Sequence, residues 1–360
     1  MNLELTDDQR LLKDMVDRFA ADVGGLDAHR AAIRSTGGWS EDAWRGLAEL
    51  GLTAILIDEA AGGLGGGGPE LMIVGEAIGR SLLSVPYLDT VVCGGTILAG
   101  APSAVRDRAL PGLLDGTSEV ALVDSGITAE DGVLTGIALG VGGGGGADRL
   151  IVAADDALYL IDCDGAGVTR ESYPLHGGGS AADVRLDAVH GERIAAGDDA
   201  ARLLGQAHDR RMAFLAAEAL GAAEGAFQAT TDYIKTRVQF GQPLATNQSL
   251  QHRAAEMLVE IEQLRSATIL AACSLDEPDG DERARIMAAV SIVAAKAAKF
   301  VAQQAVQLHG GIGVTEEHVV GHWFLRLTAI ALLLDGAAAT RTLAGLGGFV
   351  SAVPYWEAAA

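Results

Sequence analysis

Apolar side chains recur at helical spacing through the carboxy-terminal part of the chain. One stripe ends near Tyr233 and comprises Met212, Leu215, Ala216, Ala219, Leu220, Ala223, Phe227 and Ile234. Gly241 and Pro243 interrupt the pattern, and a second stripe follows with Leu250, Ala254, Met257, Ile261 and Leu264. Because such spacing brings apolar side chains to one helix face, the pattern predicts two long helices joined by a short connection. A third predicted helix runs from Ala284 to about Leu308, lined by Ile286, Val290, Val293, Ala297 and Val301. Small residues crowd the first helix, so we expect close approach of a neighbouring helix.

The pattern changes in the two preceding parts of the chain. Residues 1 to about 115 are predicted to be helical and begin with a capping box at Thr6 and Gln9. From about Glu119 to Ile194 short apolar or alternating runs, separated by Gly and Asp, predict a small antiparallel β domain; the runs are 120–123, 149–153, 158–161 and 184–189. The glycine runs 142–146 and 177–179 are interpreted as loop tips, since glycines cannot pack a strand. The predicted domains are 1–115, 116–200 and 201–360.

Composition narrows the class of protein. The net charge of −22 argues against nucleic acid and anionic membrane surfaces as partners. The acidic amino terminus does not resemble a signal peptide, and no apolar run is expected to span a bilayer, so a cytoplasmic location is expected. Cys93, Cys163 and Cys273 are far apart and are expected to be reduced, mostly buried thiols. The histidines show no metal-binding spacing, so no metal site is predicted.

The connection between the first two predicted helices contains polar side chains suited to binding a ligand. It holds one guanidinium, at Arg237, and amides at Gln239, Asn247 and Gln248. A guanidinium suits phosphate oxygens, and amides suit the edges of a planar heterocycle. The alternative is that Arg237 only stabilises the end of its helix, where a cation is favourable.

Two motifs resemble those of the acyl-CoA dehydrogenase family. The family's flavin-binding turn, R-x-x-F-G followed by a Gln, stands here as Arg237, Phe240, Gly241 and Gln248. A second motif stands as Gln307-Leu-His-Gly-Gly-Ile-Gly313, followed by Glu317-His318 and Arg326. The loop at Gly62–Gly68 also resembles a family loop, although as a sequence feature alone it is interpreted as flexible rather than as a phosphate cradle.

The resemblance implies a fold, a cofactor and partners. The fold is mainly α with a central β domain: an amino-terminal helical domain, a small antiparallel β domain and a carboxy-terminal helical bundle that pairs into dimers and tetramers. The implied cofactor is FAD and the implied substrate an acyl-CoA, with an electron-transfer flavoprotein as acceptor. The resemblance assigns cofactor binding to Arg237, Phe240, Gln248, Gln307, Gly310 and Gly311.

The sequence departs from the family at the flavin ring and at the catalytic base. The middle-domain segments that hold the ring in the family read 122–128 and 139–147 here and lack the aromatic wall and the hydroxyl. A carboxylate must take the α-proton of the thioester while the flavin accepts hydride. Asp335 stands where the family has Glu and is the candidate base, although Asp335-Gly336 also suits a solvated turn. The family's other base position falls at Arg211, which cannot act as a base.

Such losses resemble those of the catalytically degenerate subunit of actinobacterial heterotetrameric (α2β2) steroid-degrading acyl-CoA dehydrogenases. The leading hypothesis is therefore a subunit that acts on a bulky acyl-CoA together with a homologous catalytic partner. One alternative is a self-sufficient homotetramer that uses Asp335 as its base. Another is a flavin-free scaffold or CoA-ester-binding protein of the same fold.

Overall fold

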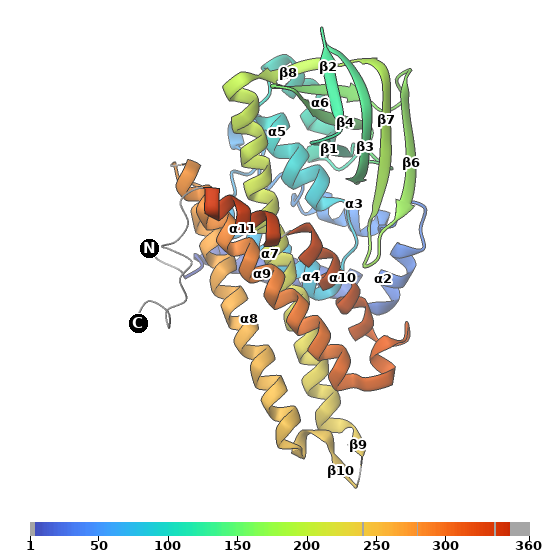
Figure 1. Ribbon diagram of the computed structural model, residues 1–360, viewed down its shortest axis with the longest axis vertical. Helices are drawn as coiled ribbons and strands as arrows, with labels where there is room; N and C mark the ends of the chain where they lie inside the picture. The colour runs from blue at the N-terminus through green and yellow to red at the C-terminus, as the bar shows by residue number, and fades with distance from the viewer. Residues whose placement is uncertain (1–3, 240, 279, 335, 346–360) are drawn as a thin grey trace.

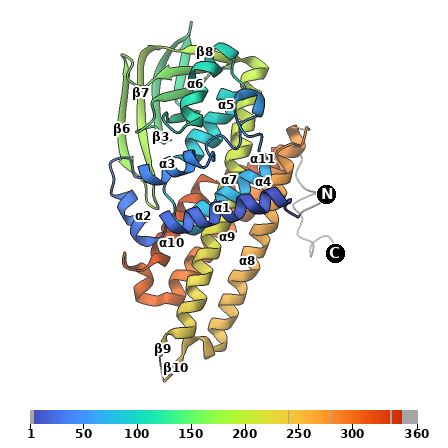
Figure 2. The same ribbon diagram turned by 180° about the vertical axis from the view of Figure 1, so that it is seen from behind.

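The computed structural model describes residues 4–239, 241–278, 280–334 and 336–345. A β domain lies at one end of an elongated molecule, and a bundle of long helices extends from it to a small hairpin at the other end (Figure 1). The helices within residues 7–81 lie against the upper half of the bundle and below the β domain, whereas those within residues 96–114 lie beside the β domain, as the view from behind shows (Figure 2). The order of helical, β and helical parts predicted from the sequence is confirmed.

The amino-terminal part is helical, as expected. The Thr6 hydroxyl accepts from the Gln9 amide nitrogen and the Gln9 side chain accepts from the Thr6 amide, so the predicted capping box is present. The helices are α1 (Asp7–Val23), α2 (Leu26–Ile33), α3 (Glu41–Glu49), η1 (Glu59–Ala61), α4 (Gly68–Ser81), η2 (Tyr87–Gly95), α5 (Thr96–Ala99) and α6 (Ser103–Leu114).

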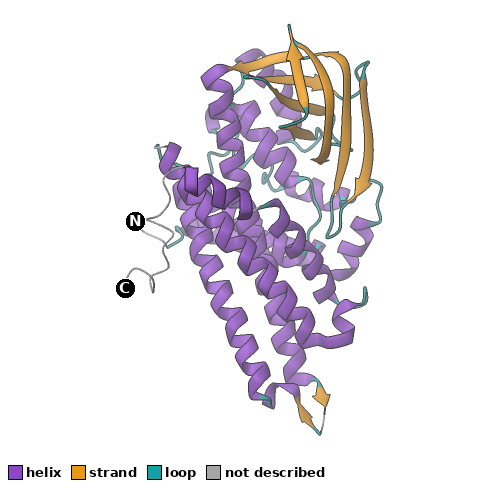
Figure 3. Ribbon diagram, viewed as in Figure 1, coloured by secondary structure: helices purple, strands orange, loops and turns teal. Residues whose placement is uncertain are grey.

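The β domain consists of two packed sheets (Figure 3). Within residues 120–196, all of which the structure describes, the sheet orders are β1-β4-β5-β8 and β2-β3-β7-β6. All neighbours are antiparallel except β1 and β4, which are parallel. The four predicted runs all fall in strands; those that the pattern missed are β2, β3, β6 and β8. The strands are β1 (Val120–Val123), β2 (Ile127–Glu130), β3 (Val133–Gly142), β4 (Arg149–Ala154), β5 (Ala157–Asp162), β6 (Val168–Pro174), β7 (Ser180–His190) and β8 (Glu192–Ala196).

The carboxy-terminal bundle buries the predicted stripes. Leu215, Leu220, Met257, Ile261 and Val290 are each at most 2% exposed, whereas Phe227 and Ile286 are partly buried at the edge of the same core. The hairpin of β9 (Val238–Gln239) and β10 (Gln242–Pro243), followed by η3 (Leu244–Thr246), connects the first two long helices. The helices are α7 (Gly197–Thr236), α8 (Gln248–Ser274), α9 (Gly280–His309), η4 (Gly310–Val314), α10 (Val319–Leu333) and α11 (Gly336–Gly345).

Helices α4 and α7 cross with their backbones nearly in contact. A Cβ atom on Gly79 would lie 2.0 Å from the carbonyl oxygen of Glu218, and one on Gly221 would lie 1.9 Å from that of Glu76. Only glycine fits at such a crossing, because any side chain would overlap the facing backbone. This contact confirms the close approach that the small residues of α7 predicted, and it fixes α7 against the amino-terminal helices.

One expectation about apolar segments was wrong. Among the described residues, Gly280–Val314 and Val319–Thr340 are long and apolar enough to cross a membrane by length and composition. The most apolar stretch of the first segment is 50% buried inside the protein, because α9 packs against α7, α8, α10 and α11. Packing in the centre of the bundle therefore accounts for the apolar sequence of α9.

Candidate functional site

A cavity of about 570 Å³ lies between the β domain and the helical bundle. We call it the interdomain cavity. Its β-domain wall is formed by 122–125 and 138–142, the segments that correspond to the flavin-ring wall in the family pattern. Its helical wall comprises His208, Asp209, Arg211, Met212, Ala284, Met287, Ala288, Ser291, Leu333, Leu334, Ala338, Ala339 and Thr342. The lining contains no Phe, Tyr or Trp among the described residues, in keeping with the expected loss of an aromatic wall.

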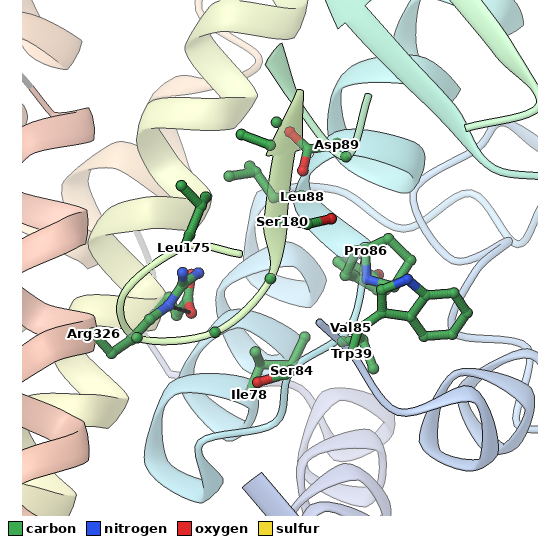
Figure 4. A pocket seen from close by; sticks show the side chains of 18 of the residues that line it. Trp39, Ile78, Ser84, Val85, Pro86, Leu88, Asp89, Leu175, Ser180 and Arg326 are labelled. Atoms are coloured by element: carbon green, nitrogen blue, oxygen red, sulfur yellow. Dashed lines mark hydrogen bonds and ion pairs between the residues drawn. The ribbon is translucent and has the colours of Figure 1, made fainter. Parts of the chain in front are cut away.

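A second cavity, of about 200 Å³, lies behind the first. We call it the inner cavity; Gly140, Gly142, Arg211 and Leu333 line both. Figure 4 shows Arg326 entering from α10 beside Leu175, whereas Asp89 and Trp39 come from the amino-terminal part. The inner cavity is unusual for a small-molecule pocket because ionisable side chains surround it: His29, Asp89, Glu119, Arg211, Glu218 and Arg326.

Two of these ionisable side chains form a bidentate ion pair. Arg326 Nε donates to Glu218 Oε1 at 2.5 Å and a terminal nitrogen donates to Oε2 at 2.8 Å. The side chains are 19% and 2% exposed, respectively. The neighbouring charges of Glu218 and Asp89 outweigh the effect of burial and raise the pKa of Arg326. The charge-assisted pair connects α10 with α7 beneath the cavity.

Asp89 and Glu119 face the glycine run of β3 and its following turn. A Cβ on Gly142 would lie 2.7 Å from Asp89 Oδ1, and one on Gly146 would lie 3.2 Å from Glu119 Oε2. Neither carboxylate has a hydrogen bond to its oxygens from another described residue.

Burial raises the pKa of Asp89, although the charge of Arg211 opposes the shift. Burial and the nearby Asp148 and Asp89 charges raise the pKa of Glu119 to about 7. The glycines of 142–146 therefore pack closely against these two carboxylates, in addition to forming a turn.

The second glycine run docks the β domain onto the helices. Gly177 has a φ of +93°, and a Cβ there would lie 2.8 Å from Cα of Arg326. Gly178 lies against Ser84 and His29. Burial lowers the pKa of His29 to about 4, so its ring is neutral at pH 7. The interpretation of 177–179 as a simple loop tip was therefore incomplete: the loop closes one side of the inner cavity.

The predicted cofactor-binding residues lie far from both cavities. Arg237 is the C-cap of α7, while Arg211 lies near the middle of the same helix. At 1.5 Å per residue the two positions are roughly 40 Å apart along the helix. Arg237, Gln248, Gln307, Gly310 and Gly311 are all exposed at the hairpin end of the bundle (Figure 1).

A ring stack brings the two predicted motifs together at that end. The rings of Tyr233 and His309 are stacked with centroids 4.5 Å apart, and His318 lies 4.5 Å from His309. His309 Nδ1 donates to the Ala305 carbonyl at 2.8 Å, and burial lowers its pKa. The buried Nε2 of His309 then carries a lone pair without a partner among the described residues. We call this region, 233–248 with 307–318, the distal tip.

Several predicted site residues have other local roles or cannot be placed. The Asn247 side chain caps α8 by accepting from the Ser249 amide at 3.0 Å, and the Gln239 side chain donates to the Val238 carbonyl at 2.9 Å. These two amides are therefore used locally. Arg237 has no side-chain hydrogen bond or ion pair with a described residue. Phe240 and Asp335 lie outside the described residues.

The residues 201–341 match the description "Acyl-CoA dehydrogenase, C-terminal domain", and 6–117 match "Acyl-CoA dehydrogenase, N-terminal domain". The acyl-CoA dehydrogenase IpdE2 of Mycobacterium tuberculosis is 32% identical over 91% of this chain and 93% of its own length. This chain belongs to the acyl-CoA dehydrogenase family. The recognition from two short motifs is thereby confirmed.

Two solved structures are similar to this chain over nearly its whole length. The ChsE4-ChsE5 complex from Mycobacterium tuberculosis contains a chain with a TM-score of 0.87 and 28% identity, covering 96% of this chain and 98% of that one. The Tcur3481-Tcur3483 steroid ACAD variant gives a TM-score of 0.87 and 29% identity, covering 94% and 97%. The family carries out oxidoreductase chemistry on CH–CH bonds, and the second of these two neighbours is described as a steroid ACAD.

Proposed function

We propose that this acyl-CoA dehydrogenase chain is the non-catalytic subunit of an FAD-dependent complex and completes the flavin site of a homologous catalytic partner. The observation that carries the proposal is the separation of the two halves of the site. The distal tip, with its predicted diphosphate ligands, lies roughly 40 Å along α7 from the cavity that corresponds to the flavin ring. Because of this distance, a flavin bound in this chain's interdomain cavity cannot also contact this chain's Arg237.

The distal tip has the donors and acceptors that a dinucleotide needs. Arg237 is exposed without a partner among the described residues, so its planar fork is available for two phosphate oxygens. The buried Nε2 of His309 is an unused acceptor beside the glycines at 310 and 311. These features fit the pyrophosphate and adenosine end of an FAD bound by a neighbouring subunit.

FAD would accept the hydride in the partner's site, and the partner would also provide the catalytic base. In this chain the helix position that could carry a base holds Arg211, which lines both cavities and whose guanidinium has donors but no acceptor. The glycine run and the apolar lining leave the interdomain cavity without an aromatic surface for the ring. We infer that this chain's contribution is to hold the cofactor and assemble the complex, with a bulky, steroid-derived acyl-CoA as the substrate of the whole complex.

The self-sufficient homotetramer is the second candidate, favoured by one observation. The interdomain cavity has a volume of about 570 Å³ at the place expected for the flavin ring, and Leu333 and Leu334 form part of its wall. A complex partner, a cytoplasmic location and an electron-transfer flavoprotein as electron acceptor complete the proposal, and each is open to direct test. The flavin-free scaffold would lack bound FAD in every preparation.

Asp335→Asn tests which chain carries the base. The substitution keeps the shape of the side chain and removes its basicity. We expect turnover of the assembled complex to change less than about twofold, because the base lies in the partner. The measurement is steady-state acyl-CoA oxidation with a dye acceptor, together with bound flavin as a check of assembly. A large loss of turnover with full flavin content would support the homotetramer instead.

Arg237→Ala tests the role of the distal tip. Loss of a charge-assisted contact to phosphate should reduce FAD affinity by roughly 1.5–3 kcal/mol. The measurement is FAD retained by the purified complex after serial dilution, with the oligomeric state followed by light scattering. Arg253→Ala is the matched control, because Arg253 lies in α8 near the same end and, within the described part of the chain, donates its side-chain hydrogen bond to Gln304. Retention equal to that of the control would refute this role for Arg237.

A further inference from the structure

Arg211 is an arginine in the walls of both cavities that forms no hydrogen bond or ion pair with the described part of the chain. It lies in α7 and lines the interdomain and the inner cavity. Its guanidinium makes no hydrogen bond or ion pair with any residue that the structure describes. The other charged groups of the interdomain cavity are paired: His208 with Asp124 at 3.2 Å, and Asp209 with Arg283 at 2.5 Å. Arg211 is therefore the cation left available to a ligand.

An unpaired guanidinium in a partly buried wall needs acceptors. It carries five N–H donors in one plane and cannot lose its proton at neutral pH. Leaving such donors without partners away from bulk water is unfavourable, so groups of this kind are normally satisfied by protein, water or ligand. Asp89 lines the same inner cavity, and the charge of Arg211 acts on it, but these two described side chains form no ion pair with each other.

The surrounding charges decide which ligand fits. Glu218 is compensated by Arg326, so it does not compete for Arg211. Asp89 lies against Gly142 and Gly143, where burial favours its protonated form. A protonated Asp89 would donate a hydrogen bond across the cavity from Arg211, and an ionised Asp89 would still leave the guanidinium donors unfilled. Both cases favour an oxygen that accepts hydrogen bonds, rather than an aliphatic chain.

We propose that Arg211 binds a hydrogen-bond-accepting oxygen, of a ketone or a carboxylate, on the acyl group of a CoA ester held in this chain's own cavities. The choice of a CoA ester rests on the proposed function; the choice of an oxygenated acyl group rests on Arg211. Arg211 occupies the position that could hold a base in a catalytic chain, and in this chain it would recognise an oxygen of the acyl group. The chain would bind a polar acyl group even though it does not oxidise it.

A matched series of esters tests this inference. Valeryl-CoA, levulinoyl-CoA and glutaryl-CoA share a chain length and differ only in the oxygen near the end of the acyl group. Titration calorimetry with the assembled protein should show about tenfold tighter binding of at least one oxygenated ester than of valeryl-CoA. A preference for levulinoyl-CoA identifies a ketone, and a preference for glutaryl-CoA identifies a carboxylate.

Arg211→Met should remove this preference while retaining valeryl-CoA binding, because Met keeps an apolar stem and lacks the donors. Arg211→Lys should retain part of the preference for oxygenated esters, and this would show that the loss in Arg211→Met does not come from a folding defect. Arg202→Met is the control, since Arg202 lies on the same helix with its side chain 52% exposed. Equal affinities in the wild type, no binding of any ester, or an unchanged preference in Arg211→Met would overturn the inference. Retained FAD, measured on the same preparations, reports on the flavin proposal separately.

Discussion

Glu218→Gln is expected to lower the free energy of unfolding by about 3–5 kcal/mol. The carboxylate is 2% exposed and accepts two hydrogen bonds from Arg326. Removing its charge leaves a guanidinium in the protein interior without its counterion, and that loss exceeds what the ion pair itself contributes to stability. Urea denaturation followed by tryptophan fluorescence would measure the change in midpoint.

Two further variants separate this effect from the loss of an ordinary ion pair. Asp199→Asn breaks the exposed pair with Arg202, whose side chains are 76% and 52% exposed, and should cost less than about 1 kcal/mol. Replacing Glu218 and Arg326 together with Met should recover much of the stability lost in Glu218→Gln, because no charge then remains buried. A double variant no more stable than the single one would contradict this explanation.

Leu220→Ala is the second large effect, with an expected loss of roughly 2–5 kcal/mol. Leu220 is 0% exposed in α7, close to the glycine crossing with α4. Because the backbones already touch at Gly221, the helices cannot move closer to fill the space that the missing side chain leaves. Thermal unfolding compared with Leu11→Ala, whose side chain is 68% exposed, provides the measurement. Equal stability of the two variants would show that the core relaxes around the cavity.

Helical periodicity carried most of the fold prediction. The stripes through Leu220 and Met257 are long enough to define a face, and both residues are fully buried. Strands without a clear apolar pattern were harder to detect. In β6 the residues Val168–Pro174 are mostly exposed, so the strand lacks the apolar alternation that reveals a half-buried one. In β3 glycines interrupt the pattern.

The candidate site could be predicted only where a motif is contiguous in sequence. Arg237 and Gln307 were found from local motifs, and the structure places their segments together through the stacked rings of Tyr233 and His309. Asp89 and Glu119 carry no local signal, because their significance comes from facing a glycine run that is distant in sequence. The same is true of Glu218, whose partner Arg326 comes from another helix.

Glycine runs show why packing escapes a sequence pattern. Gly177 and Gly142 both lie at or beside turns, as expected of glycine. Their contacts, with the backbone of Arg326 and the carboxylate of Asp89, depend on how the β domain sits against the helices. A sequence can indicate that a backbone bends at a glycine, but not which surface approaches it.

Flavin content per chain tests the central claim most directly. The chain should be purified alone and as the complex in which it is isolated from its source, and FAD quantified by absorbance after denaturation against protein by amino-acid analysis. The proposed division of the site predicts little or no FAD on the chain alone and about one FAD for every two chains in the complex. One tightly bound FAD per chain in a protein made only of this polypeptide would contradict it.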